Sequence, residues 1–282
     1  MAQSQDTFGT SGVAAGRATV PVIINGQGPF QFAVDSAANC SVISRDLLEV
    51  LDLRPTLRLA MHTLVGREMV DAVVVERLSS GALNQPFVRL AVGSRPAMAG
   101  LDGLLGSDLL ADKRLILNFR GGVRARIGGS RTSARGFLDP ADPQTSLVVA
   151  GERRFESLMM IEARVGSTPA LAIIDSGAEG TILNRAAAIA GRAQPLILGD
   201  GTNRSRIQSP TGREVAAEVM VVRSIGFAGI SVTRPPVIVG DFHTFDLWGL
   251  SDRPAMLLGI DVLSLFDSVF IDLKRGEFSV RA

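Results

Sequence analysis

The sequence predicts an all-β protein made of two similar lobes. Three observations lead to this fold class. The apolar runs are short and end at turn residues, which is typical of strands. The helix signals are brief. The stretch Ala33 to Ile43 (AVDSAANCSVI) returns 140 residues later as Ile173 to Leu183 (IIDSGAEGTIL). A repeated motif within strand-rich halves indicates a duplicated domain.

The expected strands are short runs rich in Val, Ile and Phe, bounded by Gly, Pro, Asn or Ser. In the first half they cover 18–24, 30–34, 70–76, 87–92 and 115–119. In the second half they cover 158–165, 170–174, 214–223, 230–233, 236–239 and 269–273. Ser44 and Asn184 stand where they can cap short helices over 45–50 and 185–190.

The duplication extends well beyond the acidic motif. Besides that motif, four landmarks keep their order in both halves: a Gly-x-x-Pro turn, a Gly-Arg-Glu triplet, a Leu-Leu-Gly-x-Asp-x-Leu pattern, and a four-residue stretch that ends in a basic residue. The Leu-Leu-Gly pattern covers 104–110 and 257–263, and the last stretch covers 117–120 and 271–274. We therefore expect an N-terminal lobe over 1–128, a linker over 129–150 and a C-terminal lobe over 151–282. Each lobe has the usual size of one domain.

Composition excludes several classes of protein. At 46% apolar and 20% charged residues, the 282-residue chain has enough material for two cores. A formal net charge of +1 gives no electrostatic case for nucleic acid or a membrane surface. A single cysteine, Cys40, allows no internal disulfide, and there is no His/Cys cluster for a structural metal. No apolar stretch reaches membrane-spanning length. We expect neither a metal nor a cofactor.

Two carboxylates stand out as candidates for chemistry. Asp35 and Asp175 each follow an apolar run and precede a hydroxyl and small residues. Burying an ionisable group there is unfavourable unless the group has a function or a partner. An acid at a strand end often only caps a turn. Two such acids, each followed by the same downstream glycine pattern, indicate one shared site instead.

The motif Asp-Ser-(Ala/Gly)-Ala-x-x-(Ser/Thr), followed later by two apolar residues and Gly, resembles that of the retropepsin-like aspartic proteases. The chain is similar to a tandem, single-chain member with a two-lobed, pepsin-like layout. The resemblance implies two acid-protease lobes related by a pseudo-twofold axis, with the active site at their interface. It also implies an aspartic endopeptidase in which Asp35 and Asp175 activate water by general acid/base catalysis.

The resemblance implies roles for the neighbouring residues as well. Ser36 and Ser176 would hydrogen-bond the opposite loop, while Ala37 and Gly177 would let the loops approach closely. Gly66 and Gly212 would lie in flap hairpins that close over an extended peptide, with tips at 63–66 and 209–212. Asn39 and Glu179 would contact the substrate main chain, and their difference suggests a polar or basic preference near Glu179.

One departure from the family pattern is Ala37, since glycine is usual at that position. Its methyl group is expected to crowd the opposite loop, or its backbone to be strained at an angle suited to glycine. We still expect activity, slower or narrower than usual. An alternative is a catalytically weak or inactive two-lobed peptide-binding protein of the same fold. A metal-dependent hydrolase is a further alternative, opposed by the lack of nearby His.

Other residues have structural interpretations. We expect Asp108 and Asp261 to be helix caps or internal hydrogen-bond partners rather than catalysts. His62 and His243 have no counterparts in the opposite half, which favours surface or structural roles. Cys40 is expected to pack, and Trp248 to lie in the core or line a subsite. The insertions around 199–209 and 235–250 are expected to shape the cleft or dock a partner.

The expected partner is an extended peptide or protein substrate. Because one chain encodes both acids, catalysis does not require dimerisation, and a monomer is expected. The compartment stays open. Met1 to Thr10 is polar and lacks the apolar core of a signal peptide. Bacterial enzymes of this type are often exported to the periplasm or secreted, so this chain could be a mature form whose signal peptide is missing.

Overall fold

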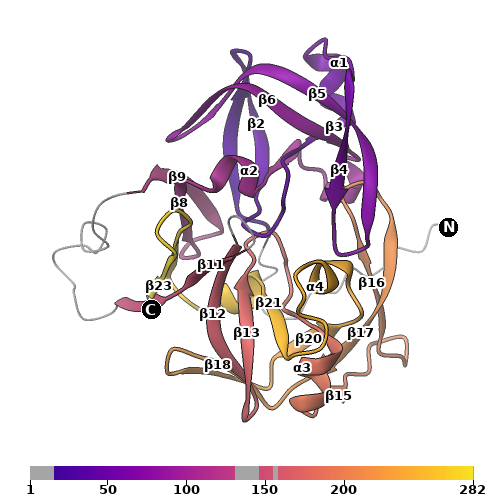
Figure 1. Cartoon of the computed structure of the whole chain (residues 1–282), viewed down its shortest axis with the longest axis vertical. Coiled ribbons are helices and arrows are strands. Elements are labelled where there is room, and N and C mark those ends of the chain that lie inside the picture. Colours follow the sequence, from indigo (N-terminus) through magenta and orange to yellow (C-terminus); the bar gives the residue numbers. More distant parts are fainter. Residues whose placement is uncertain (1–15, 131–145, 155–157, 282) are drawn as a thin grey trace.

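A computed structural model describes residues 16–130, 146–154 and 158–281 of the chain. The N-terminal stretch Met1 to Thr10 and most of the expected linker lie outside these described residues. Figure 1 shows two β-rich lobes one above the other, with the first half of the chain in the upper lobe and the second half in the lower lobe. Among the described residues, no helix is long and apolar enough to cross a membrane.

In the described part of the chain, the upper lobe contains a seven-stranded sheet in the order β1-β2-β7-β3-β6-β5-β4. In addition, β1 pairs with β5. The elements of this lobe are β1 (Thr19–Ile24), β2 (Gln27–Val34), β3 (Val42–Ser44), α1 (Arg45–Val50), β4 (Leu57–His62), β5 (Arg67–Ser80), β6 (Leu83–Gly93), the 3₁₀ helix η1 (Pro96–Met98), β7 (Gly103–Leu105) and α2 (Ser107–Leu110).

The lower lobe contains an eleven-stranded sheet, counted over the described residues. Its elements are β11 (Glu152–Arg154), β12 (Leu158–Val165), β13 (Thr168–Ile174), β14 (Ile182–Leu183), α3 (Arg185–Ala190), β15 (Gln194–Pro195), β16 (Arg204–Gln208), β17 (Glu214–Val221), β18 (Ser224–Phe227), β19 (Ile230–Thr233), β20 (Pro236–Val239), α4 (His243–Leu247), β21 (Ala255–Leu258) and α5 (Ile260–Leu263).

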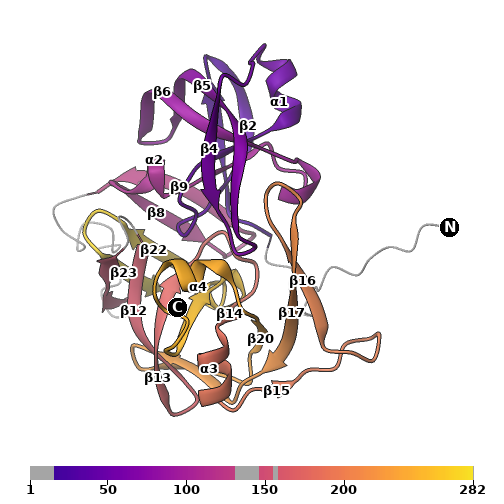
Figure 2. The same ribbon diagram turned by 45° about the vertical axis from the view of Figure 1, so that its right-hand side comes forward.

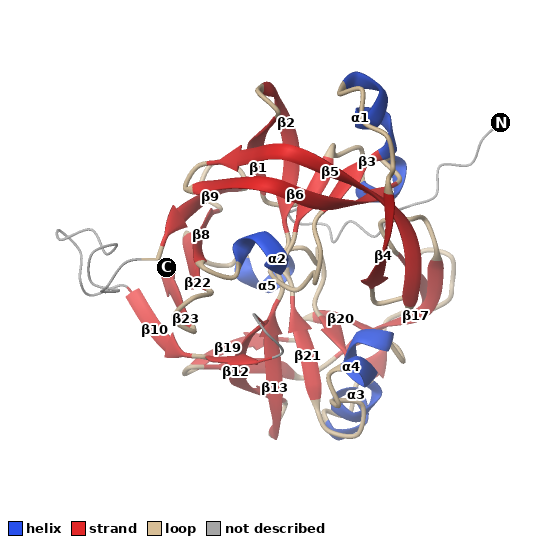
Figure 3. Ribbon diagram, turned by 45° about the horizontal axis from the view of Figure 1, so that its top comes forward, coloured by secondary structure: helices blue, strands red, loops and turns tan. Residues whose placement is uncertain are grey.

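The two sheets share one topology. The path β12-β13-β21-β14-β20-β17, with β16 paired to β17, repeats the order of the upper lobe strand for strand. The long β5–β6 hairpin of the upper lobe is divided in the lower lobe, where β18 and β19 form a separate hairpin beside β12. Strands dominate both lobes, and the helices are short (Figure 3). The predicted all-β, two-lobed fold class is confirmed.

A five-stranded sheet joins the lobes, in the order β10-β23-β22-β8-β9. Its strands come from both halves: β8 (Lys113–Asn118), β9 (Arg124–Gly129), β10 (Ser146–Ala150), β22 (Ser268–Asp272) and β23 (Glu277–Arg281). Near the middle of the antiparallel β8–β22 pair, Ile116 faces Phe270. One apolar cluster runs from the upper lobe through this sheet into the lower lobe. The lobes therefore share a core and are not merely tethered.

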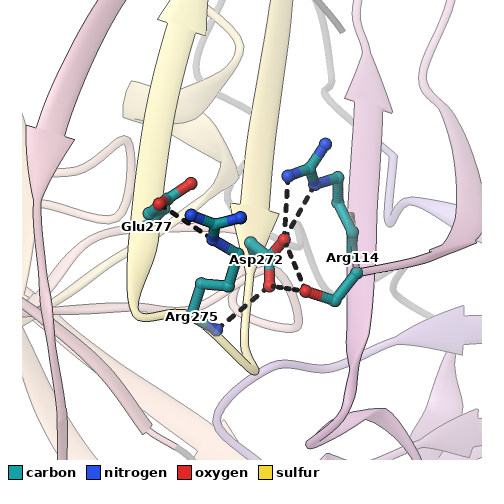
Figure 4. A network of polar contacts seen from close by, with 5 residues as sticks. Arg114, Asp272, Arg275 and Glu277 are labelled. Carbon is teal, nitrogen blue, oxygen red and sulfur yellow. Dashed lines mark hydrogen bonds and ion pairs between the residues drawn. The ribbon is translucent and has the colours of Figure 1, made fainter. Parts of the chain in front are cut away.

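A buried ion pair lies within the five-stranded sheet (Figure 4). The guanidinium of Arg114 donates from Nε and Nη2 to Asp272 Oδ2, at 3.0 and 2.8 Å, and the two side chains are only 3% and 2% exposed. Asp272 Oδ1 accepts from Ser130 Oγ at 2.8 Å and from the Arg275 amide at 3.1 Å. Full hydrogen bonding of the carboxylate offsets the cost of burying it.

The helix starts differ from expectation in one respect. The helices over 45–50 and 185–190 form where predicted, and Asn184 Oδ1 accepts from the Ala187 amide at 2.8 Å as a helix cap. Ser44 makes no such bond, and its buried hydroxyl has no partner among the described residues. Ser44 therefore stands at the predicted N-cap position, but its side chain does not supply the capping hydrogen bond. Its backbone instead belongs to β3 and donates to the Asp102 carbonyl.

Replacing Arg114 by Met should destabilise the protein by about 3–5 kcal/mol, because Asp272 would stay buried without its cation. Urea unfolding would measure the change. The control is Arg120→Met, which removes an exposed ion pair with Asp267 and should cost less than about 1 kcal/mol. Equal losses for the two variants would contradict the role given to the buried pair.

Candidate active site

The two acids lie at equivalent strand ends, one in each lobe. Asp35 follows β2, and its amide donates to the Leu105 carbonyl at 2.9 Å. Asp175 follows β13, and its amide donates to the Leu258 carbonyl at 3.1 Å. β2 pairs in parallel with β7, and β13 pairs in parallel with β21. The leucine-glycine landmark therefore lies directly beside each acid.

Each acid is oriented by its own loop. Asp35 Oδ1 accepts from the amides of Ala37 and Ala38, at 3.1 and 2.8 Å. Asp175 Oδ1 accepts from the amides of Gly177 and Ala178, at 2.9 and 3.0 Å. In both cases one carboxylate oxygen is fixed by backbone donors. The other oxygen of each carboxylate accepts no hydrogen bond from the residues that the structure describes.

The serines after the acids bond across the lobe boundary. The Ser36 amide donates to Ser176 Oγ, and the Ser176 amide donates to Ser36 Oγ, both at 3.1 Å. The Ser36 hydroxyl donates to the Ile174 carbonyl at 2.8 Å, and the Ser176 hydroxyl donates to the Val34 carbonyl at 2.9 Å. Both serines are fully buried. This reciprocal set ties the two acidic loops to each other.

The opposite loops approach so closely that only glycine fits at one position. A Cβ added to Gly177 would lie 2.6 Å from Asp35 Oδ1 and still closer to the rest of that carboxylate. The Asp35 carboxylate therefore lies against the Asp175 loop. In the matching position, the Ala37 side chain packs beside an apolar cluster of the lower lobe.

The predicted backbone strain at Ala37 is wrong. Neither Ala37 nor Gly177 has a positive φ angle, so this position does not need the conformational freedom of glycine. What matters at position 177 is space and not the backbone angle.

Asp108 and Asp261 each accept hydrogen bonds from a residue at the end of an acidic loop. Asp108 accepts from the hydroxyl and the amide of Ser41, at 2.7 and 3.0 Å. Asp261 makes the same two bonds to Thr181, at 2.7 and 3.0 Å. The helix caps next to them are Gly106 and Gly259, so neither acid caps its helix. Of the two structural roles expected, the internal hydrogen-bond partner is the one observed.

Gly106 and Gly259 are needed because neighbouring backbone fills the space that a side chain would take. A Cβ on Gly106 would lie 2.8 Å from the Cys40 carbonyl oxygen, and one on Gly259 would lie 2.7 Å from that of Gly180. This explains why the repeated leucine-leucine landmark ends in glycine in both halves. Cys40 itself is partly buried and packs on a small apolar cluster of the upper lobe.

Burial raises the pKa of both candidate catalytic acids. The pKa of Asp175, which is 5% exposed, is raised to about 7, first by burial and then by the negative charge of Asp35. The pKa of Asp35 is also raised by burial. The positive charge of Arg17 acts in the opposite direction on both acids. The pair therefore retains one proton into the neutral range and titrates as a unit.

The two predicted flaps are hairpins. Flap 1 is formed by β4 and β5, with its turn at 63–66, and flap 2 is formed by β16 and β17, with its turn at 209–213. Gly66 and Gly212 lie in these turns with φ angles of 153° and 93°, which L-residues with a side chain rarely adopt. The stretch 199–209, expected as an insertion, therefore contains the first strand of flap 2.

Each flap tip contacts the opposite lobe. The Leu64 carbonyl of flap 1 accepts from the His243 amide of α4 at 3.1 Å. The Pro210 carbonyl of flap 2 accepts from the Ser94 amide of the upper lobe at 2.8 Å. Figure 2 shows the β16–β17 hairpin reaching from the lower lobe to the upper lobe. Both flaps thus bridge the two lobes.

Asn39 and Glu179 already have partners. Asn39 Oδ1 accepts from the His62 amide of flap 1 at 3.3 Å. Glu179 forms an ion pair with Arg17 across the lobes, at 3.3 Å between Nε and Oε1. Because Arg17 balances the charge of Glu179, the structure gives no support to a basic preference there. The partners of these two matching positions nonetheless differ, since Asn39 bonds flap 1 and Glu179 pairs with Arg17.

A cavity of about 280 Å³ lies beside the acidic loop of the upper lobe. Its walls include Ala37, Asn39 and His62 from the upper lobe, and Leu158, Thr244 and Trp248 from the lower lobe. The Thr244 hydroxyl is buried and has no hydrogen-bond partner among the described residues. In the same part of the chain, no group of three or more His, Cys, Asp or Glu side chains lies together as a metal site would require.

Sequence reasoning missed the contribution of four residues to this region. Arg17 precedes the first strand without any motif, and its role depends on a partner 162 residues away. His62 and His243, which we expected to be separate structural residues, lie in contact with each other. Thr244 follows His243 in a segment expected only to shape the cleft or dock a partner. No local pattern signals these contacts, because each one arises from packing between the lobes.

Comparison with known proteins agrees with the duplication. A family model described as "Aspartyl protease" matches residues 20–109 and 161–262, so that each match contains one of the two acidic motifs. Among solved structures, the chain is similar to a retropepsin-like aspartic protease from Rickettsia conorii. The identity is 17%, over 48% of this chain and 88% of that chain, with a TM-score of 0.32. No curated protein matched.

Gly177→Ala should destabilise the protein by about 1–3 kcal/mol, because its methyl group would displace the Asp35 carboxylate or the loop that holds it. The matched variant Ala37→Gly should cost less than about 1 kcal/mol, the usual backbone effect of glycine. Urea unfolding of both variants would test this difference. A Gly177→Ala protein as stable as the wild type would disprove the close contact.

Proposed function

The chain belongs to the aspartyl protease family, and from this premise we propose that it is an aspartic endopeptidase. An extended peptide would bind between the carboxyl groups of Asp35 and Asp175, which would together hydrolyse its peptide bond. The observation that carries the proposal is the reciprocal Ser36–Ser176 hydrogen bonding, which draws two acidic loops with raised pKa values together. Two strand-end acids with only capping roles would need no such connection.

The protonation of the pair suits general acid/base hydrolysis. The ionised Asp35 would take a proton from the attacking water, while the protonated Asp175 would donate its proton to the carbonyl oxygen of the peptide. The water oxygen then bonds to the carbonyl carbon, giving a tetrahedral intermediate. Asp35, which now carries a proton, donates it to the leaving nitrogen, and the C–N bond breaks. At the same time one hydroxyl of the intermediate gives its proton to the ionised Asp175 and becomes the carbonyl of the product acid, so both acids return to their starting states.

The loops prepare the acids for this work before substrate arrives. Backbone amides already fix Oδ1 of each acid, so little reorganisation is needed as charge moves between them. Burial keeps the shared proton on the pair up to about pH 7, where an isolated aspartate would long have lost it. Above that pH the donor would be lost and the rate should fall.

The flaps suit an extended peptide. A peptide beneath a hairpin can form strand-like hydrogen bonds through its main chain, while pockets bind alternate side chains. The cavity of about 280 Å³ next to Ala37 is large enough for a bulky side chain and has apolar walls from Leu158 and Trp248. The unpartnered Thr244 hydroxyl would meet a polar atom of the substrate there.

Asp35→Asn and Asp175→Asn should each lower peptide cleavage by about 10²–10⁴-fold or more, because each removes one partner of the acid/base pair. Digestion of a peptide library, followed by mass spectrometry, would measure this loss. Asp252→Asn, on an exposed turn, is the matched control and should cleave like the wild type. Peptide binding by the wild type without any cleavage would favour a non-catalytic binding protein, and cleavage surviving both substitutions would exclude the proposed pair.

Asp175→Asn should stabilise the protein at neutral pH but not in acid. In the folded state the pKa of Asp175 is raised from 3.8 to about 7. Between these values the unfolded chain has lost the proton that the folded chain keeps, so wild-type stability falls as the pH rises. The variant avoids this loss, and its advantage should grow from about pH 4 to about pH 7. Urea unfolding at several pH values would show it; a constant advantage would contradict the raised pKa.

A further inference from the structure

Flap 1 is joined to the lower lobe by two histidines that face each other across the cleft. His62, at the end of β4, and His243, at the start of α4, lie with Nδ1 and Nε2 only 3.0 Å apart. Their rings are nearly parallel, at 11°, with centroids separated by 5.3 Å. The chain contains only these two histidines.

The histidine contact belongs to a larger set of contacts at the flap tip. Next to it, the His243 amide donates to the Leu64 carbonyl at 3.1 Å. The Leu64 side chain packs on the apolar cluster of the lower lobe that includes Phe245 and Trp248. We call the His62–His243 contact and the Leu64 contacts together the flap 1 latch.

We propose that His62 and His243 are positioning residues that hold flap 1 closed at neutral pH and release it when both rings carry a proton. This goes beyond the proposed peptidase function, on which only the kinetic part of the test below rests. The inference assigns a role to the flap contact and not to the chemistry at the two aspartates.

The proton count of the pair explains the switch. In the neutral pair, one ring donates an N–H and the other accepts with a lone pair. One added proton still leaves one acceptor, so the bond survives. A second proton removes the last acceptor and places two cations in contact, which is repulsive. The latch therefore fails at the second protonation.

The surroundings move this step into acid. Burial lowers the pKa of His62 from its ordinary value of 6.5, and the positive charges of His243 and Arg67 lower it further. Arg67 faces His62 from β5, its partner position in the flap hairpin. Asp108 lines the same cavity as His62 from the upper lobe. Below about pH 6.5 the released flap binds more protons than the latched flap, so the latch weakens as the pH falls.

Flap 2 provides an internal comparison because its contacts contain no histidine. Its tip is held by the Pro210–Ser94 backbone bond and by Thr211, whose hydroxyl donates to Glu68 at 2.7 Å. Arg213 lies 4.0 Å from the same carboxylate. Gln208, the last residue of β16, occupies the place that His62 has at the end of β4. Glu68 belongs to β5 of flap 1. Protonation of imidazole therefore acts directly on flap 1 and reaches flap 2 only through the Glu68 contacts.

The latch also bounds the cavity beside the acidic loop. His62 forms part of its wall, and the neighbour of His243, Thr244, forms another part. Release of flap 1 would open this cavity at the side of the upper-lobe acid. The opening would occur in acid, where the aspartate pair holds its shared proton.

Hydrogen exchange on the intact protein tests the latch without any activity. Protection factors, corrected for intrinsic rates, are compared for 57–66 in flap 1 and 204–213 in flap 2, at about pH 7.5 and about pH 4.5. Loss of one hydrogen bond predicts that flap 1 protection, relative to flap 2, falls about fivefold or more in acid. In His62→Ala, which has no side-chain hydrogen-bonding group, the ratio should be low at both pH values. An unchanged wild-type ratio would overturn the proposal.

Kinetics give the second test, on any peptide that the wild type cleaves. His62→Ala should raise KM, by a factor about fivefold larger near pH 7.5 than near pH 4.5, where the wild-type latch is already open. Gln208→Ala in flap 2 is the matched control, and its effect on KM should not depend on pH. A His62→Ala effect of equal size at both pH values would show a merely structural role. If no peptide is cleaved, the exchange experiment still decides.

Discussion

The reciprocal hydrogen bonds of Ser36 and Ser176 are the constraint on which the rest of the molecule depends. Each hydroxyl and each amide of the pair bonds the opposite loop, so neither acidic loop is complete without the other lobe. The bonds are fully buried, where an unmet polar group would be costly. They keep the carboxylates close enough for the charge of one to raise the pKa of the other. The five-stranded sheet and its shared core hold the lobes at the distance these bonds require.

The two lobes keep one scaffold and differ in their acidic loops and flaps. Strand order, the Ser41–Asp108 and Thr181–Asp261 supports and the close-fitting glycines are the same in both. The acidic loops, by contrast, differ at Ala37 and Gly177, and the flap contacts differ in chemistry. A duplicated chain can change one half-site without changing the other, which a symmetric dimer of identical chains cannot do.

Most of the fold could be predicted from sequence because its signals are local. Short runs rich in Val, Ile and Phe, bounded by turn residues, predicted the strands. Repetition predicted the lobes and indicated Asp35 and Asp175 as partners. The contacts that depend on tertiary packing were not legible. His62 and His243 are 181 residues apart and share no motif. The backbone strain expected at Ala37 is absent. Glycine is required only at the matching position 177, where the Asp35 carboxylate of the opposite loop leaves no space for a side chain. The sequence alone does not show where that opposite loop lies.

The two flap contacts, on Ser94 and on His243, have a topological consequence. With both tips attached to the opposite lobe, the flaps and the floor of the cleft form a closed ring. A linear chain with a free end can be threaded lengthwise through a ring. An internal segment of a folded protein can enter only sideways, after one tip has detached. Whether a substrate offers an end or a loop therefore decides how much each tip contact slows its capture.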